Sequence, residues 1–205
     1  MNRSSFTIIL ILFGLFQVQG CQKENRPAPQ ATSEHITSTF LSHFEPYCGQ
    51  TFKGLSTYTD LGEDHPLDGA NLTMIIQSCD ENEIRIPFFV ENDSSRTWIF
   101  TMTPEGLRLS HDHRYEDGSE YEANMYGGVA MENTGVFEHF PEGVRSSETL
   151  LFFPADAETL ADRPAREINV WSAEFNLHNQ IYFYRLFLYG ELRYEAAFDL
   201  SNPVD

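Results

Sequence analysis

The sequence predicts a mainly antiparallel β domain, a barrel or a sandwich, preceded by one short helix. After about residue 50, apolar residues alternate with polar ones, which is the period of a strand with one buried face. The alternating segments are short, and Gly, Pro, Asn and Asp separate them at nearly even spacing, as in antiparallel meanders. Only the segment just before them has helical periodicity.

The expected helix begins at Ser33, whose hydroxyl can accept a hydrogen bond from an otherwise unpaired backbone N–H group. Pro46 and Gly49 end it, because proline cannot continue a helix and glycine favours its termination. Four apolar side chains at helical spacing share one face: Ile36, Phe40, Leu41 and Phe44. We therefore expect a short helix that acts as a plug ahead of the strands.

The strands follow one another along the rest of the chain. In order, they are expected at Thr51–Tyr58, Asn71–Cys79, Ile84–Val90, Trp98–Met102, Leu107–His113, Tyr121–Tyr126, Val136–Phe140, Thr149–Phe153, Ile168–Phe175, Ile181–Leu188 and Leu192–Leu200. A helix followed by such a meander resembles the calycin-like barrel of lipocalins and fatty-acid-binding proteins. This resemblance implies an antiparallel barrel, but a fold alone does not carry a function.

Two cysteines, Cys48 and Cys79, are expected to form a disulfide. If the first two strands pair as a hairpin, these cysteines lie opposite each other near its open end. A bond that closes a loop of this size stabilises a fold by about 3 kcal/mol. The chain has no C-x-x-C motif, so we interpret the bond as structural rather than redox-active.

Residues 1–20 have the features of a secretory signal peptide. Arg3 precedes the apolar run Ile8–Phe16, which is too short to be expected to span a bilayer. The run ends in Val18-Gln19-Gly20-Cys21, which resembles the lipobox of bacterial lipoproteins, except that Gln19 stands where a small or β-branched residue is commoner. The resemblance covers the first 21 residues and implies cleavage before Cys21, whose thiol then receives a diacylglyceryl group. The alternative is an ordinary secreted protein with an incidental cysteine.

The lipobox resemblance also implies a place in the cell. Lipid at Cys21 would anchor the mature chain to a membrane of the cell envelope. In Gram-negative sorting, aspartate after the lipidated cysteine retains a lipoprotein at the inner membrane. Gln22 stands there, which implies the outer membrane, facing the periplasm. Residues 21–34 are polar and proline-containing and are expected to be a lipidated tether, whereas residues 35–205 have the length of a single barrel domain.

The composition is strongly acidic. The chain has 13 basic and 31 acidic residues, a net charge of −18, and loss of Arg3 with the leader makes it −19. Because phosphate binding requires clustered Lys or Arg, we expect no nucleic-acid partner. We interpret the charge as a means of solubility or an adaptation to salt, with recruitment of cations or basic partners as the alternative.

The densest polar segment is His111–Glu120, with the sequence HDHRYEDGSE. Because side chains alternate along a strand, His111 and His113 share the face of two preceding leucines, which should be the core face. Asp117-Gly118 is a strong hairpin turn signal and would pair His113 with Glu122. The resulting inner face is the candidate ligand-binding set: His111, His113, Tyr115, Glu120, Glu122 and Asn124. A register slipped by one residue would instead turn Tyr121, Ala123 and Met125 inward.

Three interpretations of this cluster remain open. It can bind a small molecule at a barrel mouth, hold a metal ion through His111, His113 and Glu122, or be a structural set of histidine–carboxylate pairs. We expect a small-molecule-binding or structural module, with no cofactor, no metal and no catalytic residue. The alternative is a hydrolase or a metal-assisted enzyme that uses the His111/His113 hairpin. The sequence motifs of serine hydrolases, zinc proteases and P-loop proteins are absent.

Two further resemblances involve this segment. His111-Asp112-His113 resembles the first motif of cupins, but Ser146 stands where their second motif supplies a histidine. The segments HDHR-EDGS and MYGG, the latter Met125–Gly128, resemble those of exported bacterial proteins of uncharacterised function. That resemblance also takes in Asn169–Trp171 and Phe198–Leu200 and implies a shared fold, without an activity or a catalytic residue.

Overall fold

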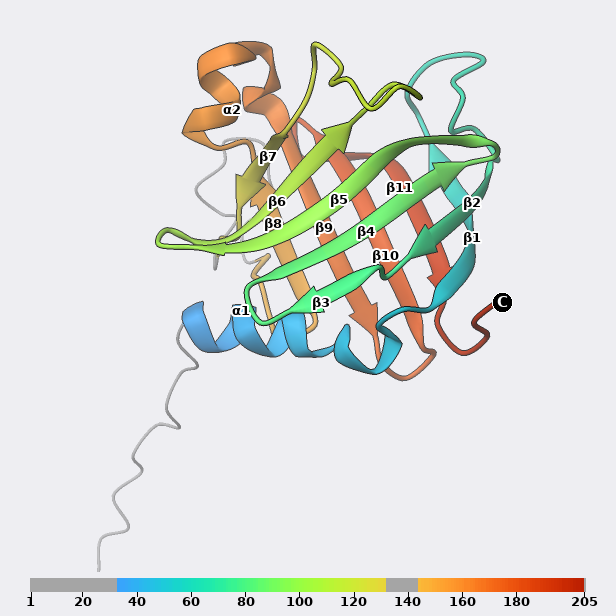
Figure 1. The fold of residues 1–205 in the computed structure, drawn as a ribbon. Helices are drawn as coiled ribbons and strands as arrows, with labels where there is room; N and C mark the ends of the chain where they lie inside the picture. The colour runs from blue at the N-terminus through green and yellow to red at the C-terminus, as the bar shows by residue number, and fades with distance from the viewer. Residues whose placement is uncertain (1–32, 132–143, 205) are drawn as a thin grey trace, which may run out of the picture. The chain divides into compact units, whose positions relative to one another are not determined.

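The computed structural model describes residues 33–131 and 144–204 (Figure 1). The chain divides into two units, Met1–Gln30 and Ala31–Asp205, and all described residues belong to the second. The signal peptide, Cys21, nearly all of the tether and the strand expected at Val136–Phe140 lie outside the described residues. Within the described part, no helix is long and apolar enough to cross a membrane.

An antiparallel sheet follows the helix α1 (Ser33–Ser42) and the 3₁₀ turn η1 (Glu45–Tyr47). Its strands are β1 (Thr51–Thr59), β2 (Asn71–Ile75), β3 (Ser78–Asp80), β4 (Glu83–Val90), β5 (Asp93–Thr103), β6 (Gly106–His113), β7 (Tyr126–Val129), β8 (Leu150–Pro154), β9 (Asn169–Asn176), β10 (Ile181–Leu188) and β11 (Glu191–Asp199). Their order is β7-β6-β5-β4-β2-β1-β11-β10-β9-β8, and β3 pairs with β4. A nearly closed barrel results, which confirms the predicted mainly antiparallel, calycin-like fold with one preceding helix.

Three details differ from the predicted elements. The segment expected as one strand, Asn71–Cys79, is broken at Ile76 and Gln77 into β2 and β3. The prediction of a strand at Tyr121–Tyr126 is wrong, because β7 begins only at Tyr126. A short helix, α2 (Ala157–Asp162), and the turn η3 (Pro164–Ile168) lie between β8 and β9 and are not among the predicted elements.

The barrel closes where β7 meets β8. The contact consists of two isolated bridges, Gly128 to Ala155 and Met131 to Phe152, and the Met131 N–H donates to the Phe152 carbonyl at 2.9 Å. A Cβ atom on Gly127 would lie 1.8 Å from the Leu109 carbonyl oxygen, and one on Gly128 would lie 1.8 Å from that of Pro154. The two glycines therefore allow the backbone of β7 to approach both neighbouring strands.

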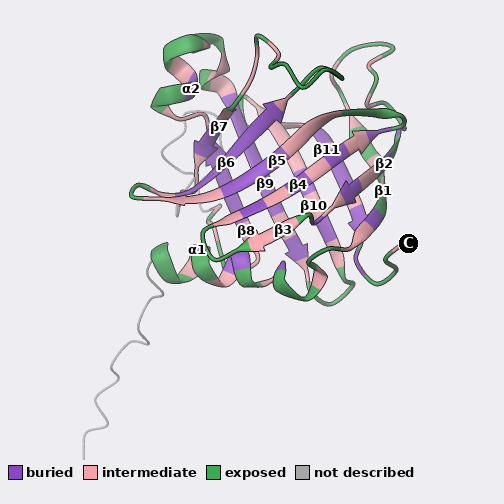
Figure 2. Ribbon diagram, in the orientation of Figure 1, coloured by how far each residue is buried: buried purple, intermediate pink, exposed green. Residues whose placement is uncertain are grey.

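The helix α1 covers one end of the barrel (Figure 1). Aromatic side chains pack at this end. Phe40 and Phe44 have no exposed surface, and their rings lie 5.3 and 4.7 Å from the ring of Phe175 on β9. The strands supply the rest of the core by alternation. In β4, for example, buried residues alternate with partly buried ones (Figure 2), as the period-two pattern predicts.

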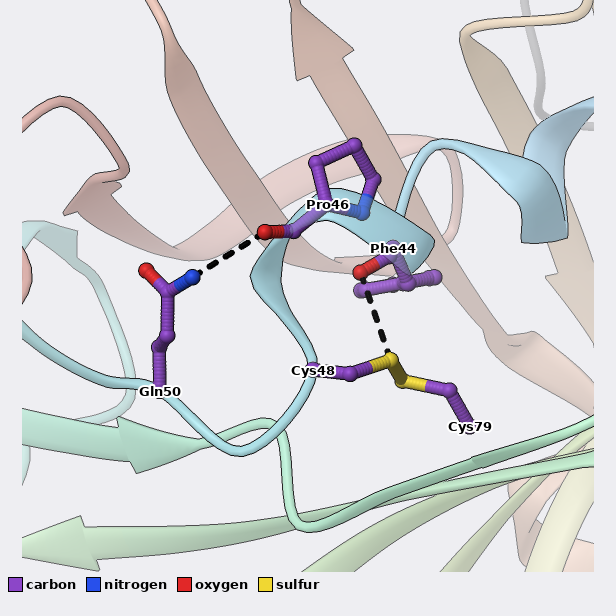
Figure 3. The surroundings of a disulfide bond; sticks show 5 residues. All are labelled: Phe44, Pro46, Cys48, Gln50 and Cys79. Atoms are coloured by element: carbon purple, nitrogen blue, oxygen red, sulfur yellow. Dashed lines mark hydrogen bonds between the residues drawn. A yellow bond between two sulfur atoms is a disulfide. The ribbon is translucent and has the colours of Figure 1, made fainter.

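The disulfide between Cys48 and Cys79 is present and confirms the predicted pairing (Figure 3). It joins the chain after η1 to β3 across a Cα–Cα distance of 6.0 Å. Nearby, the Gln50 side-chain amide donates to the Pro46 carbonyl at 3.0 Å. The disulfide therefore ties the segment that follows the helical plug to the sheet, in addition to restricting the unfolded chain.

We expect Gly128→Ala to destabilise the barrel by about 3 kcal/mol or more, because the added methyl group collides with the β8 backbone at the closure. Urea unfolding measures the effect. Gly118→Ala is the matched control, since Gly118 has φ +83° and nothing within 4 Å of an added Cβ. The loss of stability in that variant should come from backbone strain alone and amount to about 1 kcal/mol. Equal losses in the two variants would contradict the role of Gly128 in closure.

Candidate functional site

A cavity of about 130 Å³ lies inside the barrel among aromatic and basic side chains. It is bordered by the chain between β1 and β2 and by η3, at the end of the barrel away from α1 (Figure 1). Its aromatic walls are Phe88, Trp98, Tyr126, Trp171, Tyr184 and Tyr194, and its basic groups are Arg96, His111, His113 and Arg166. Leu61, Leu67, Leu186 and Thr97 complete the lining.

His111 is buried and hydrogen-bonded through both ring nitrogens. Its Nδ1 lies 3.0 Å from the Tyr126 carbonyl oxygen, and its Nε2 lies 2.6 Å from the Tyr184 hydroxyl. A carbonyl oxygen only accepts, so Nδ1 carries the proton of the neutral ring and Nε2 accepts from the Tyr184 O–H group. Burial lowers the pKa of His111 to about 3, and the positive charges of Arg166 and Arg108 act in the same direction.

His113 lies next to His111 on the inner face of β6, nearer the solvent. Its Nε2 is 3.2 Å from the Tyr126 hydroxyl, and its backbone N–H donates to the Asn124 side-chain oxygen at 2.6 Å. Burial lowers the pKa of His113 to about 4, with further contributions from the positive charges of Arg96 and Arg166. Both imidazoles are therefore neutral hydrogen-bonding groups at pH 7.

Tyr126 connects the two histidines to an arginine above them. The His111 ring stacks on the Tyr126 ring at 4.7 Å and an interplanar angle of 11°. The guanidinium carbon of Arg166 lies 3.8 Å from the centre of the same Tyr126 ring, which is a cation–π contact. The Tyr126 ring therefore contacts both the neutral imidazole of His111 and the positively charged guanidinium group of Arg166.

An ion pair on the outside of β6 positions the segment that carries Arg166. The Arg108 Nε donates to the Asp156 carboxylate at 2.6 Å, and the other oxygen of that carboxylate caps α2 by accepting from the Thr159 N–H at 2.8 Å. The Thr159 hydroxyl in turn donates to the Gly127 carbonyl at 2.9 Å. These bonds hold α2 against β7, and η3 follows directly after α2.

The predicted register of the hairpin is wrong. Arg114 pairs with Glu120 near the turn, as in the slipped alternative, but β6 and β7 then pair His111 with Tyr126. The Tyr115 N–H donates to the Ser119 carbonyl, which closes a tight local turn around Asp117-Gly118. The residues between Glu120 and Tyr126 therefore bulge out of the ladder instead of continuing it.

Only part of the predicted inner face is inside. His111 and His113 reach the cavity, and Asn124 contacts the His113 backbone. Tyr115 is 54% exposed, and Glu120 is exposed and pairs with Arg114 at 3.1 Å. Glu122 is also exposed, and its carbonyl accepts from Arg163. The expectation that these three face inward is wrong, because Tyr115 and Glu120 lie in the exposed local turn around Asp117-Gly118 and Glu122 lies in the exposed bulge.

Apart from His111 and His113, the lining residues are not among the sequence candidates; they include Trp98, Tyr126, Arg166 and Tyr184. Strand parity could have placed Trp98 and Tyr184 on the inner face, but tryptophan and tyrosine there are expected as ordinary core. Nothing in the local sequence indicates that Arg166 reaches the barrel. In residues 33–131 and 144–204, no three His, Cys, Asp or Glu side chains are grouped so that they could hold a metal ion.

The neutral state of the two histidines predicts acid destabilisation. In the unfolded chain these histidines bind protons near pH 6.5, whereas in the folded chain they do so only near pH 3 to 4. Their contribution to the free energy of unfolding is therefore fully present above pH 6.5 and is lost as the pH falls below that value. For buried His111, the slope approaches about 1.4 kcal/mol per pH unit. We expect His111→Gln to flatten the dependence in urea unfolding between about pH 6.5 and pH 5.

His178→Gln is the matched control for that measurement, because His178 is exposed in the turn after β9. It should retain the wild-type slope. A wild-type stability that does not change over this pH range would contradict the burial of neutral histidines.

Searches against protein-family models, curated proteins and solved structures found no match to this chain.

Proposed function

We propose that this protein is a lipid-anchored module of the cell envelope that binds a small molecule in the cavity beside His111 and His113. The cavity itself is the observation that supports binding. It combines aromatic walls with a few convergent polar groups, which is the usual composition of a small-molecule site. Its volume of about 130 Å³ is similar to that of an engineered cavity of about 150 Å³ that takes up benzene. A molecule with one ring or a short chain therefore fits.

The geometry favours binding over the hydrolase alternative. A general base works best with a pKa near the working pH, but the pKa of His111 is lowered to about 3 and that of His113 to about 4. Both nitrogens of His111 are also occupied by hydrogen bonds. The carboxylate required by the metal interpretation, Glu122, lies on the exposed bulge. These groups suit recognition of a bound molecule better than proton transfer.

Filling part of the cavity should weaken binding. The only two tryptophans, Trp98 and Trp171, line it, so their fluorescence reports occupancy directly. We expect benzyl alcohol, a neutral single-ring probe, to bind with a dissociation constant of about 1 mM. Leu186→Phe places a larger side chain in the lining and should weaken binding at least about tenfold.

Leu177→Phe makes the same change at a position that is 54% exposed and does not line the cavity, and it should bind like the wild type. The absence of a saturable fluorescence change in wild-type protein, or equal binding by both phenylalanine variants, would refute small-molecule binding at this site.

The membrane part of the proposal depends on Cys21, which lies outside the described residues. We expect the wild-type chain to incorporate labelled palmitate in its own host and to sediment with membranes, because two or three acyl chains give stable anchoring. Cys21→Ser should abolish both. Cys48→Ser, which removes a cysteine of the disulfide, controls for loss of a thiol and should still be labelled. A wild-type chain without label would contradict the anchor.

A further inference from the structure

We propose that the ligand of the cavity is a small monocarboxylate with a single apolar ring, and that Arg166 is the residue that binds its charge. This inference rests on the proposed small-molecule binding and adds the chemical class of the ligand.

The first argument is the sign of charge at the cavity. The chain has a net charge of −18, yet the described residues that line the cavity include two arginines, Arg96 and Arg166, and not one Asp or Glu. The two histidines below them are neutral, so they donate and accept hydrogen bonds without adding charge. An acidic protein thus surrounds one small basic cavity, which favours an anion over a cation or a neutral molecule.

The second argument is that no carboxylate of the described residues forms an ion pair with Arg166. Among the described residues, six arginines each have a carboxylate oxygen within 4.0 Å: Arg85, Arg96, Arg108, Arg114, Arg185 and Arg193. Arg96 is one of these, because Asp93 neutralises it. No carboxylate of the described part pairs with Arg166, whose guanidinium carbon lies 3.8 Å from the centre of the Tyr126 ring and which also hydrogen-bonds to the Tyr126 side chain. Arginine has five N–H donors in a fixed plane, so these contacts with Tyr126 leave donors for a carboxylate.

The third argument is the shape of the remaining space. The Trp98 ring stacks on Phe88 at 4.4 Å and on Tyr184 at 4.3 Å, so flat rings form one wall. A volume of about 130 Å³ holds one six-membered ring with a small substituent, and little more. A carboxylate on such a ring can accept two parallel hydrogen bonds from a guanidinium group. Benzoate has these properties and is the probe that we choose.

The test compares benzoate with benzamide, which has the same shape without the charge, on the full chain by tryptophan fluorescence. We expect benzoate to bind at least about tenfold more tightly than benzamide. Arg166→Gln should remove this preference, whereas Arg166→Lys should retain part of it. Arg163→Gln, an equal loss of charge on the same segment but outside the cavity lining, should retain the full preference.

The outcomes separate the two proposals. Binding of both probes with equal affinity, or a benzoate preference that survives Arg166→Gln, overturns the inference and leaves small-molecule binding intact. Failure of both probes and of benzyl alcohol to bind overturns the proposed function and, with it, the inference.

Discussion

The close approach of β7 to β6 and β8, which two glycines permit, is the constraint on which the rest of the structure depends. Without this approach the sheet would be open, and the outer edges of β7 and β8 would lack a hydrogen-bonding partner. The ladder between β6 and β7 places Tyr126 beside His111, whose Nδ1 bonds to the Tyr126 carbonyl. The hydrogen bond from His111 to the Tyr184 hydroxyl links β6 to β10, strands from opposite halves of the sheet order that face each other across the barrel.

A second constraint acts from outside the barrel. Arg108 and Asp156 are both mostly buried, and pairing two charges in such a place gives little net stability, because each loses its hydration. The ion pair instead fixes the position of the segments that it joins. The pair fixes the start of α2, α2 contacts Gly127, and the following turn carries Arg166 over Tyr126. Closure and cavity are therefore coupled, since the same glycine segment contacts both the barrel edge and the helix that precedes the arginine.

The sequence alone predicts the elements that depend on local pattern. Alternation identifies β4, β10 and the inward direction of His111 and His113, and hairpin geometry identifies the Cys48–Cys79 bond. The register beyond Asp117-Gly118 could not be predicted, because a turn that satisfies its own hydrogen bonds does not require the ladder to continue. Arg166 could not be predicted either, since its place depends on an ion pair between β6 and the chain before α2, which are far apart in sequence.

The two ends of the barrel differ in a way that a purely structural role does not explain. At one end, the rings of Phe40 and Phe44 are fully buried and pack against the ring of Phe175. At the other, aromatic walls surround about 130 Å³ that no side chain of the described residues fills. Left dry, such a void costs about 3 kcal/mol, and a single larger side chain at Leu186 could reduce it. The fold thus places aromatic rings at one end and leaves open the end that carries its neutral histidines and Arg166, which has no carboxylate partner among the described residues. This is the arrangement expected if a ligand completes the packing there.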